Sequence, residues 1–329
     1  MKLSIIVPVF NRPEEIEELL TSLVNQTDSD FQLVIVEDGS TITCEDVCKK
    51  FSDKINIKYF YKPNTGRSDT RNYGMERAEG DYFIIFDSDV ILPNHYIKTV
   101  RTLLTNNYAD CFGGRDDAGQ NFSPLQKAVN YSMTSFFTTG GIRAGKINLK
   151  SYHPRSFNMG FSRAVFETVG GYKNMIGEDI DLSIRIKAKN FKVDYFEDAY
   201  VYHKRRVSIK KYFKQVKTFG KGRIILSRMY KNTLKLIHLL PMFFVLSCFA
   251  LVLLSTLSFL SPYFLLSLLP ILFLAVLLFV DSSIRNLSIK IGFLSVITSF
   301  VQLFGYGLGE LSEVFTGKAM KKTQEENYR

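Results

Sequence analysis

Charged residues are absent from one long stretch of this sequence. Between Leu236 and Val280 there is no Asp, Glu, Lys or Arg, although these four residue types make up 22% of the 329 residues. Forty-five residues in a helix would extend roughly 67 Å, enough for about two crossings of a ~30 Å hydrocarbon core. Ser261 and Pro262 interrupt the stretch near its middle, as a tight turn between two helices would. The absence of charge therefore predicts two membrane spans, at about 236–258 and 262–280.

A second apolar stretch, Ile291 to Gly309, is shorter and ends in three closely spaced glycines. It is a candidate third span at about 291–309, with an interfacial or re-entrant segment as the alternative. Three crossings would place Lys318, Lys321 and Lys322 outside, against the tendency of basic residues to stay in the cytoplasm. Two crossings would keep these lysines inside. The sequence leaves both topologies open.

Acidic residues are absent from the segment that precedes the spans. Residues 204–235 hold twelve Lys or Arg and no Asp or Glu, which leaves 30 of the 42 basic residues against 32 acidic ones elsewhere. The net charge of +10 thus has one source, and a nucleic-acid-binding protein is not indicated. A basic segment beside a span favours the cytoplasmic side and anionic headgroups.

Apolar residues recur within this basic segment at helical spacing. The pattern predicts an amphipathic helix at the membrane interface, with its apolar side facing lipid. A basic surface helix packed on the globular part is the alternative. The apolar residues are Ile209, Tyr212, Phe213, Val216, Phe219, Ile224, Ile225 and Met229.

Cysteines are few and show neither paired nor zinc-like spacing. Cys44, Cys48, Cys111 and Cys248 are therefore expected to be reduced, structural thiols. The N-terminus does not have the layout of a signal peptide, because its short apolar run leads directly into the polar residues 11–15. We expect the globular part to stay in the cytoplasm, with a bacterial inner membrane as the location.

Strand-like and helix-like segments alternate in the first part of the chain. This alternation predicts an α/β domain with a mostly parallel sheet, right-handed crossovers and strands buried on both faces. The expected strands are Leu3–Val9, Phe31–Val36, Ile55–Tyr61, Tyr82–Phe86, Ala109–Gly114 and Phe191–Phe196. The expected helices are Pro13–Asn25, Cys44–Phe51, Ser68–Ala78, Pro93–Thr105, Ala164–Val169 and Ile180–Lys189.

The chain therefore divides into four parts. They are a globular domain over 1–203, the basic segment over 204–235, a membrane region over 236–310 and a polar tail over 311–329. Within the first domain the pattern loosens from Gln120 to His153, and loop-rich regions of this kind commonly determine substrate specificity.

Two carboxylates two positions apart follow one of the expected strands. Asp87 and Asp89 flank Ser88 directly after the run Tyr82–Phe86. Open α/β sheets bind ligands at the carboxyl ends of their strands. Carboxylate oxygens there suit a hard divalent cation and the diphosphate that it neutralises. Acidic residues also end strands simply because the chain meets water there, so this motif alone does not establish a cation site.

A second pair of acids, Glu37 and Asp38, ends another expected strand before a Gly-Ser turn. Such carboxylates can accept hydrogen bonds from a nucleobase imide or a ribose hydroxyl. A solvated strand end with a capping residue is the alternative.

Two further segments surround expected helix N-termini. Near Gly66, Arg67 or Arg71 could reach a phosphate bound at the helix N-terminus. The segment does not have the sequence of a phosphate-binding P-loop. A helix cap with surface arginines is the alternative. After Gly177, the acids Glu178 and Asp179 could supply a general base for an attacking sugar hydroxyl, or could merely favour the helix dipole.

Together these segments resemble the inverting nucleotide-sugar glycosyltransferases of family 2, which have the Rossmann-like GT-A fold. The resemblance runs from Ser4 to about His203. Its motifs in order are Glu37-Asp38-Gly39-Ser40, the segment from Gly66 to Asn72, Asp87-Ser88-Asp89 and Gly177-Glu178-Asp179. The stretches Asn158–Arg163 and Val169–Tyr172 resemble the acceptor-side segment of that family.

The resemblance implies a role for each of these residues. Asp38 would read the nucleobase, and Asp179 would deprotonate the acceptor with Glu178 beside it. A single in-line displacement would invert the anomeric centre. The implied nucleotide-sugar-binding residues are Pro8, Phe10, Glu37, Asp38, Arg71, Asp87 and Ser88. The implied ligands of Mg²⁺ or Mn²⁺ are Asp87 and, above all, Asp89.

Tryptophan is absent, so the Gln-x-x-Arg-Trp motif of processive cellulose- or chitin-type synthases is absent too. With a small membrane part, this favours transfer of a single sugar, from a UDP-sugar or alternatively a GDP-sugar, to a lipid-linked saccharide or other glycan for cell-surface polysaccharide assembly. One alternative is a polyprenyl-phosphate glycosyltransferase resembling dolichyl-phosphate mannose synthase. Another is a non-catalytic nucleotide-binding subunit of a membrane complex. The oligomeric state is not predicted.

Overall fold

The computed structural model describes residues 1–117, 122–139, 149, 152–204 and 208–316. They form two compact units. The first unit contains the described residues of Met1–Gly119 and Ile147–Lys204, and the second contains those of Gln120–Lys146 and Arg205–Glu326. The segment that interrupts the first unit falls inside the domain expected over 1–203. The expected tail beyond Thr316 lies outside the described residues.

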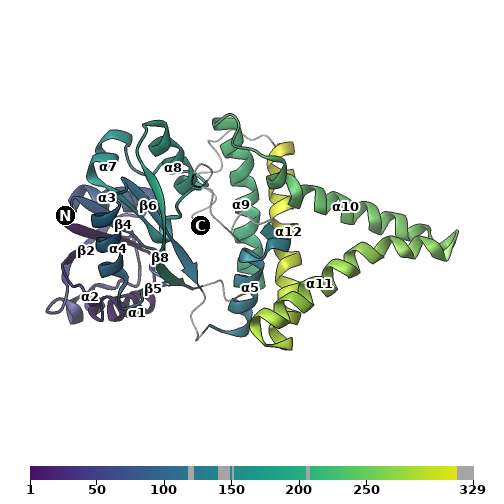
Figure 1. The fold of residues 1–329 in the computed structure, drawn as a ribbon, viewed down its shortest axis with the longest axis horizontal. Coiled ribbons are helices and arrows are strands. Elements are labelled where there is room, and N and C mark those ends of the chain that lie inside the picture. The colour runs from purple at the N-terminus through teal and green to yellow at the C-terminus, as the bar shows by residue number, and fades with distance from the viewer. Residues whose placement is uncertain (118–121, 140–148, 150–151, 205–207, 317–329) are drawn as a thin grey trace. The chain divides into compact units, whose positions relative to one another are not determined.

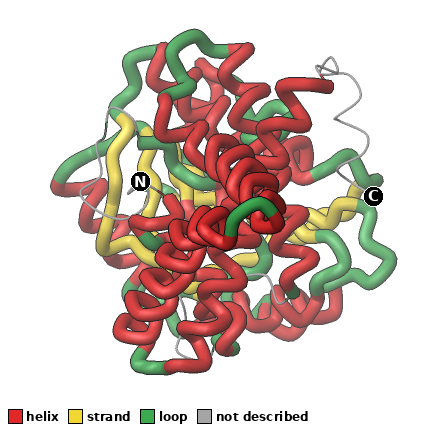
Figure 2. The backbone as a smooth tube through the Cα atoms, turned by 90° about the vertical axis from the view of Figure 1, so that its right-hand side faces the viewer, coloured by secondary structure: helices red, strands yellow, loops and turns green. Residues whose placement is uncertain are grey.

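Eight strands among the described residues of the first unit form one mixed sheet, in the order β3-β2-β1-β4-β7-β6-β8-β5 (Figures 1 and 2). The strands are β1 (Leu3–Val9), β2 (Phe31–Asp38), β3 (Asn56–Lys62), β4 (Tyr82–Ile85), β5 (Val90–Ile91), β6 (Cys111–Asp117), β7 (Met159–Ser162) and β8 (Val193–His203). The pairs β1–β2, β1–β4, β2–β3 and β6–β8 are parallel, whereas β4–β7, β6–β7 and β5–β8 are antiparallel. The mostly parallel sheet follows the prediction, while β5 and β7 were not expected.

Helices cover both faces of this sheet. The helices of the first unit are α1 (Pro13–Val24), α2 (Glu45–Phe51), α3 (Arg67–Arg77), α4 (Tyr96–Asn106), η1 (Ser156–Asn158), α7 (Arg163–Val169) and α8 (Glu178–Ala188). Side chains alternate along β1, so that Ile5 and Val7 join the core under α1 and α4, and Ile6 joins the core under α3 and α8. Burial on both faces explains the continuous apolar strands of the sequence.

The second unit is helical. Its elements are α5 (Pro124–Thr134), α6 (Phe136–Thr139), α9 (Ile209–Met229), η2 (Leu236–Leu239), α10 (Leu240–Ser255), η3 (Thr256–Phe259), η4 (Pro262–Leu268), α11 (Leu269–Asn286) and α12 (Ile289–Thr316). Within this unit α10 and α11 form a hairpin that projects away from α12 (Figure 1). Three segments are long and apolar enough to cross a membrane: Leu236–Phe259, Pro262–Asn286 and Ile289–Thr316.

The expected amphipathic helix is present as α9, but part of its apolar side is covered by protein, while Ile209 and Phe219 are exposed. Tyr212 and Val216, which we expected to face lipid, are buried in a cluster with Val129 and Met133 of α5. A Cβ at Gly220 would overlap the backbone of Tyr306 in α12, so the two helices pack with their backbones close together. Helical periodicity reveals an apolar side but not whether lipid or protein covers it.

The crowded centre of the sheet gives a test of the first unit. Gly160 of β7 lies between Ile84 and Phe112 in the register, and a Cβ there would come within 2.8 Å of Phe112 Cζ. The ring cannot move easily because it is stacked between Tyr82 and Phe196. We expect Gly160→Ala to lower the free energy of unfolding by ~1–3 kcal/mol through overpacking, measured by denaturation of the solubilised protein.

A double-mutant cycle supplies the control. In a Phe112→Leu background the ring atoms are gone, so the same alanine should cost less than it does in the native chain. An equal cost in both backgrounds would show that the clash is not the cause.

Candidate active site

The predicted acids gather at one edge of the sheet. Strands β2 and β4 both pair in parallel with β1, so their carboxyl ends lie together. Asp38 ends β2, Asp87 follows β4, and Pro8 and Phe10 lie at the end of β1. Phe10 is exposed, whereas Ser88 is buried.

Arg71 of α3 joins two of the motifs. Its guanidinium donates a 2.7 Å hydrogen bond to Asp87 Oδ1 and a 3.1 Å hydrogen bond to Glu178 Oε1, across 107 positions of chain. Arg67 donates to the other oxygen of Glu178 at 2.9 Å. Arg71 is only 1% exposed, and its guanidinium lies 5.1 Å from the centre of the Tyr172 ring. The segment after Gly66, the acids after β4 and the start of α8 therefore meet at one point.

These neighbours keep the guanidinium of Arg71 protonated. Burial by itself would lower the pKa of Arg71, but the charges of Asp87 and Glu178 outweigh burial and raise that pKa. The guanidinium is therefore a permanent cation between two carboxylates, and it limits how far the two motifs can separate.

A histidine completes a group of possible metal ligands. Ligand atoms of Asp87, Asp89 and His203 all lie within 4.8 Å of one another, and His203 Nε2 is 3.2 Å from Asp89 Oδ1. Two carboxylates and an imidazole form a donor set that fits a divalent cation such as Mg²⁺ or Mn²⁺. The ring of Phe157 stacks on His203 at 4.3 Å and fixes its orientation.

His203 was not predicted as a site residue. The antiparallel pairing of β5 with β8 sets Val90 opposite His203, and the Lys204 N–H donates a 3.0 Å hydrogen bond to the Asp89 carbonyl. A strand of two residues leaves no periodic signal in a sequence. The one available signal was a histidine at the end of a strand in a chain with four histidines.

Asp38 organises the turn that leads into α3. Its carboxylate accepts hydrogen bonds from the backbone N–H groups of Thr65 and Gly66, both at 2.9 Å, and from Lys62 Nζ at 2.5 Å. A carboxylate offers about four acceptor positions, so roughly one remains for a ligand. Lys62, a buried partner of this acid, was not predicted from the sequence.

Glu37 contacts the protein with both carboxylate oxygens. One accepts a 2.6 Å hydrogen bond from the Cys44 N–H and the other accepts from the Ser40 hydroxyl. The intervening Gly39 has φ +73°, and a Cβ there would lie 2.6 Å from Asn64 N, so this turn requires glycine. In this structure Glu37 thus holds the loop after β2.

Asp179 lies in the first turn of α8, after Gly177 in the left-handed conformation. Its Oδ1 accepts a 2.8 Å hydrogen bond from the Ile180 N–H, and its Oδ2 lies 3.4 Å from Arg155 NH1. Burial alone would raise the pKa of Asp179, but Arg155, the Ile180 N–H and the nearby arginines outweigh burial and lower it. The carboxylate is therefore ionised at neutral pH. Arg155 is a further residue that sequence reasoning missed.

Comparison with known proteins identifies the sequence. The model of glycosyl transferase family 2 matches residues 4–170, about half of the chain. The chain belongs to glycosyl transferase family 2. The resemblance read from its motifs is thereby confirmed.

Curated relatives match over about 110 residues. Glycosyltransferase GlyA of Streptococcus pneumoniae is 34% identical over 110 residues, covering 33% of this chain and 16% of GlyA. Poly(ribitol-phosphate) β-N-acetylglucosaminyltransferase TarS of Staphylococcus aureus is 31% identical over 114 residues, covering 33% of this chain and 20% of TarS. The chain thus spans only a small part of the length of these relatives.

Solved structures show the fold. Mannosyltransferase PcManGT of Pyrobaculum calidifontis, in complex with GDP-Man and Mn²⁺, has a TM-score of 0.65 at 13% identity, covering 95% of this chain and 87% of that one. TarS 1–349 in complex with UDP has a TM-score of 0.50 at 19% identity, covering 97% and 92%. The predicted GT-A fold followed by apolar helices is confirmed.

The link through Arg71 gives a test of how the site is held. We expect Arg71→Met to lower the free energy of unfolding by ~1–3 kcal/mol, because it leaves Asp87 without its partner and the buried Glu178 with only Arg67 as a counter-charge. Arg71→Lys keeps the charge but not the forked geometry, so its loss should be smaller. Thermal or chemical denaturation of the solubilised variants measures both.

The matched control is Arg77→Met on the same helix. Arg77 is partly exposed, pairs with the neighbouring Glu76 at 3.4 Å and lies over the ring of Tyr73, and each of these contacts is worth about 1 kcal/mol or less at a surface. A loss for Arg71→Met as small as that for Arg77→Met would contradict the proposed tie between the motifs.

Proposed function

We propose that this protein is a membrane-bound, inverting glycosyltransferase. It moves a single sugar from a nucleotide-sugar to an acceptor held at the membrane, a lipid-linked saccharide of cell-surface polysaccharide assembly. The observation that carries the proposal is the hydrogen-bonded link from Asp87 through Arg71 to Glu178. It joins the acids suited to a donor diphosphate with the residue directly before Asp179, the acid suited to an acceptor hydroxyl.

The chemistry needs one base. The acceptor hydroxyl attacks the anomeric carbon of the donor, the bond from that carbon to the diphosphate breaks, and the hydroxyl proton passes to Asp179. Attack opposite to the leaving group inverts the anomeric centre. The ionised state of Asp179 suits this role, because only the carboxylate can take up a proton.

Arg67 and Arg71 hold Glu178 beside the base, so that Glu178 supports its position and does not compete for the proton. Asp87, Asp89 and His203 would hold Mg²⁺ or Mn²⁺. The cation would supply positive charge where negative charge builds on the leaving diphosphate.

The donor is a nucleotide-sugar. The remaining acceptor position of Asp38 suits a nucleobase imide, with Pro8 at the end of β1, Phe10 just after it and the buried Ser88 at the same sheet edge. Two structures of the same fold, PcManGT and TarS, were solved with GDP-Man and with UDP. We favour a UDP-sugar and keep a GDP-sugar as the alternative.

The helical unit supports the proposed acceptor and location. Three apolar segments can cross a membrane, and the basic residues before them favour a catalytic unit on the cytoplasmic side. TarS acts on poly(ribitol-phosphate) by its name, which supports a cell-surface polymer or its lipid-linked precursor as the acceptor. A polyprenyl phosphate itself is the second candidate, because a site anchored at a membrane can reach either lipid.

The proposed site is tested by removing one acid at a time. We expect Asp89→Asn and Asp179→Asn each to lower sugar transfer by ~10²-fold or more in membranes, because one loses a cation ligand and the other loses the base. The assay is a screen of nucleotide-sugars with and without Mn²⁺. Thin-layer analysis with polyprenyl phosphate or with a polyprenyl-diphospho-sugar separates the two acceptors.

Asp46→Asn is the matched control, because the Asp46 side chain is 95% exposed and lies away from the acids. Undiminished turnover in both site variants would exclude this site. Nucleotide binding without transfer from any donor would support the non-catalytic subunit instead.

The pKa of Asp179 gives a separate prediction. A depressed pKa keeps the carboxylate ionised as pH falls, so kcat/KM should not decline from protonation of Asp179 between pH 7 and about pH 5. Arg155→Gln removes a nearby positive charge and raises the pKa of Asp179, so the acidic limb should move to higher pH. Profiles of kcat/KM against pH measure the shift.

Arg101→Gln is the control, because Arg101 pairs with Asp28 and not with the site. If Arg155→Gln and Arg101→Gln both keep the native acidic limb, Asp179 is not the group that must be ionised.

A further inference from the structure

We propose that α9 and α12 of the second unit lie in the headgroup layer of one membrane leaflet, and that only the α10–α11 hairpin crosses the bilayer. The partner is the surface of a leaflet with anionic headgroups. The inference rests on the membrane location in the proposed function and is independent of sugar transfer.

The three apolar segments differ in how much protein covers them. The most hydrophobic windows of Leu236–Phe259 and Pro262–Asn286 are 11% and 6% buried, whereas that of Ile289–Thr316 is 50% buried. Phe249 and Phe273 of the hairpin are each more than two-thirds exposed. Exposed apolar surface on all sides requires hydrocarbon around it. The hairpin therefore needs hydrocarbon on all sides, whereas α12, which is half covered by protein, does not.

The second half of α12 is covered by α9. Backbones approach closely where a Cβ at Gly309 would overlap the Lys217 carbonyl, and Arg228 pairs with Glu313 at 2.8 Å. The depth of α9 in a membrane therefore fixes the depth of this half of α12.

Helix α9 cannot lie in hydrocarbon. It carries Lys210, Lys214, Lys217 and Lys221 at intervals of four, three and four residues, which places them on one side of the helix. No carboxylate partner is found for these four among the described residues, and α9 contains no acid. A lysine at the bilayer centre is unfavourable, because its ammonium group would lose its hydration there. The row of lysines therefore requires water and headgroups.

The first half of α12 is covered by α5, which is also polar. Ser132 Oγ lies 2.7 Å from Thr298 Oγ1 and 3.1 Å from Ser299 Oγ. Helix α5 also carries Lys127 and Asn130. Thr298 and Glu313 are 15 residues apart, about 22 Å along a helix. An α12 that crossed the bilayer would carry α5 or α9 into the hydrocarbon, so α12 lies parallel to the surface.

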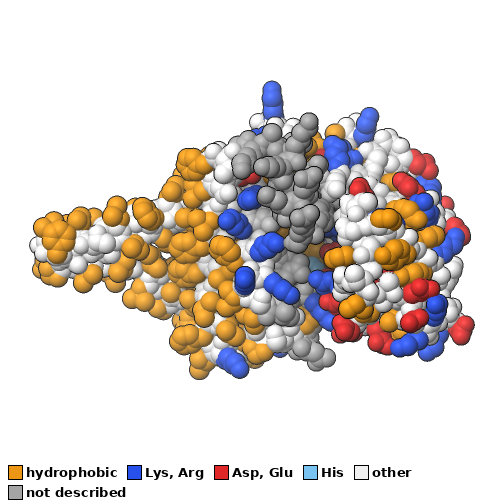
Figure 3. All heavy atoms as spheres, turned by 180° about the vertical axis from the view of Figure 1, so that it is seen from behind, with side chains coloured by type: hydrophobic (Ala, Val, Ile, Leu, Met, Phe, Trp, Pro, Cys, Tyr) orange, Lys and Arg blue, Asp and Glu red, His pale blue; other side chains and the backbone are white. Residues whose placement is uncertain are grey.

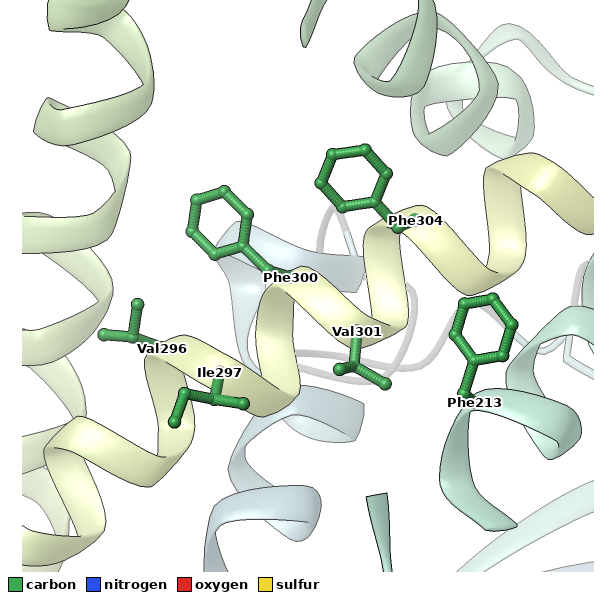
Figure 4. Close-up of a pocket in the computed structure, with 6 residues that line it drawn as sticks. All are labelled: Phe213, Val296, Ile297, Phe300, Val301 and Phe304. Atoms are coloured by element: carbon green, nitrogen blue, oxygen red, sulfur yellow. The ribbon is translucent and has the colours of Figure 1, made fainter. Parts of the chain in front are cut away.

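The side of α12 that α5 and α9 leave partly open fits this orientation, and Phe300 and Phe304 on this side also contact Phe244 of α10. Val296, Ile297, Phe300, Val301 and Phe304 line a wholly apolar groove of about 420 Å³ together with Phe213 of α9 (Figure 4). Lys210 and Lys217 flank Phe213 one helical turn before and after it. Basic side chains border the apolar surface of this unit (Figure 3). Lipid phosphates would lie over these lysines, with their hydrocarbon chains in the groove.

This orientation settles the number of crossings. Two crossings return the chain to the side on which it entered, so the tail beyond Thr316, which lies outside the described residues, stays with the first unit. The positive-inside tendency is then satisfied for Lys318, Lys321 and Lys322.

The absence of tryptophan makes the depth of α12 measurable. Each single Phe→Trp variant of the full chain contains one tryptophan, whose emission can be excited separately from that of the tyrosines. Phe293, Phe304 and Phe315 span 22 residues of α12, about 33 Å along the helix and close to the ~30 Å core. The variants are reconstituted in phosphatidylcholine–phosphatidylglycerol vesicles whose chains carry bromine near the headgroup or near the chain end, and fluorescence quenching reports depth.

We expect all three α12 tryptophans to be quenched best by bromine near the headgroup. Phe249→Trp in α10 is the matched control and should be quenched best by bromine near the chain end. A shallow, deep, shallow order along α12 would overturn the proposal, because α12 would then span the bilayer. No quenching at Phe304→Trp by either lipid would also overturn it and would indicate a second copy of the chain on this face. Neither readout depends on catalytic activity.

Should Phe304→Trp fail to fold, Phe300→Trp on the same side of α12 replaces it. Labelling of a cysteine added at the C-terminus gives an independent check. An impermeant maleimide should leave it unmodified in intact cells but modify it in opened cells. Modification in intact cells would contradict two crossings, and the native cysteines give little background because all four are buried.

Discussion

The site depends on the pairing of one buried cation with two carboxylates. A guanidinium that is 1% exposed must have counter-charges, since an unpaired charge in the interior would cost several kcal/mol. Arg71 obtains them from Asp87, which follows β4, and from Glu178, which begins α8. The acids after β4 and the start of α8 are therefore held close by electrostatics. A sheet edge alone would place the first motif but would leave the second free to move.

Neighbours in sequence reach different surroundings for a geometric reason. Successive residues of a strand point to opposite faces of the sheet. Glu37 therefore points toward the loop before α2 and accepts hydrogen bonds there with both oxygens, while Asp38 points toward the turn before α3. Sequence motifs put the two acids together in one nucleotide-binding role. Only the hydrogen-bond partners show that each acid also holds a different loop in place.

What the sequence could predict follows from how local each signal is. The strands around β1 and the acids that follow them were predictable, because apolar runs and strand ends are local features. His203, Lys62 and Arg155 were not, since each reaches the site through a contact distant in sequence: the β5–β8 pairing, the Asp38 carboxylate and the start of α8. Helix α5 was missed for the same reason, because its buried side is completed by the distant α12.

The helical unit shows more clearly that hydropathy alone cannot identify which helices cross a membrane. By composition alone α12 is a membrane span, and α9 is an amphipathic helix that faces lipid. In the structure each helix covers part of the other, and the small residues Gly220, Gly305 and Gly309 are the sequence feature that permits it, because close backbone packing needs glycine. Once half of α12 is covered by a lysine-bearing helix, its apolar length no longer implies a crossing. The charged residues of α9 determine how deep α12 can lie in a membrane. The hydropathy of packed helices must therefore be evaluated for the helices together.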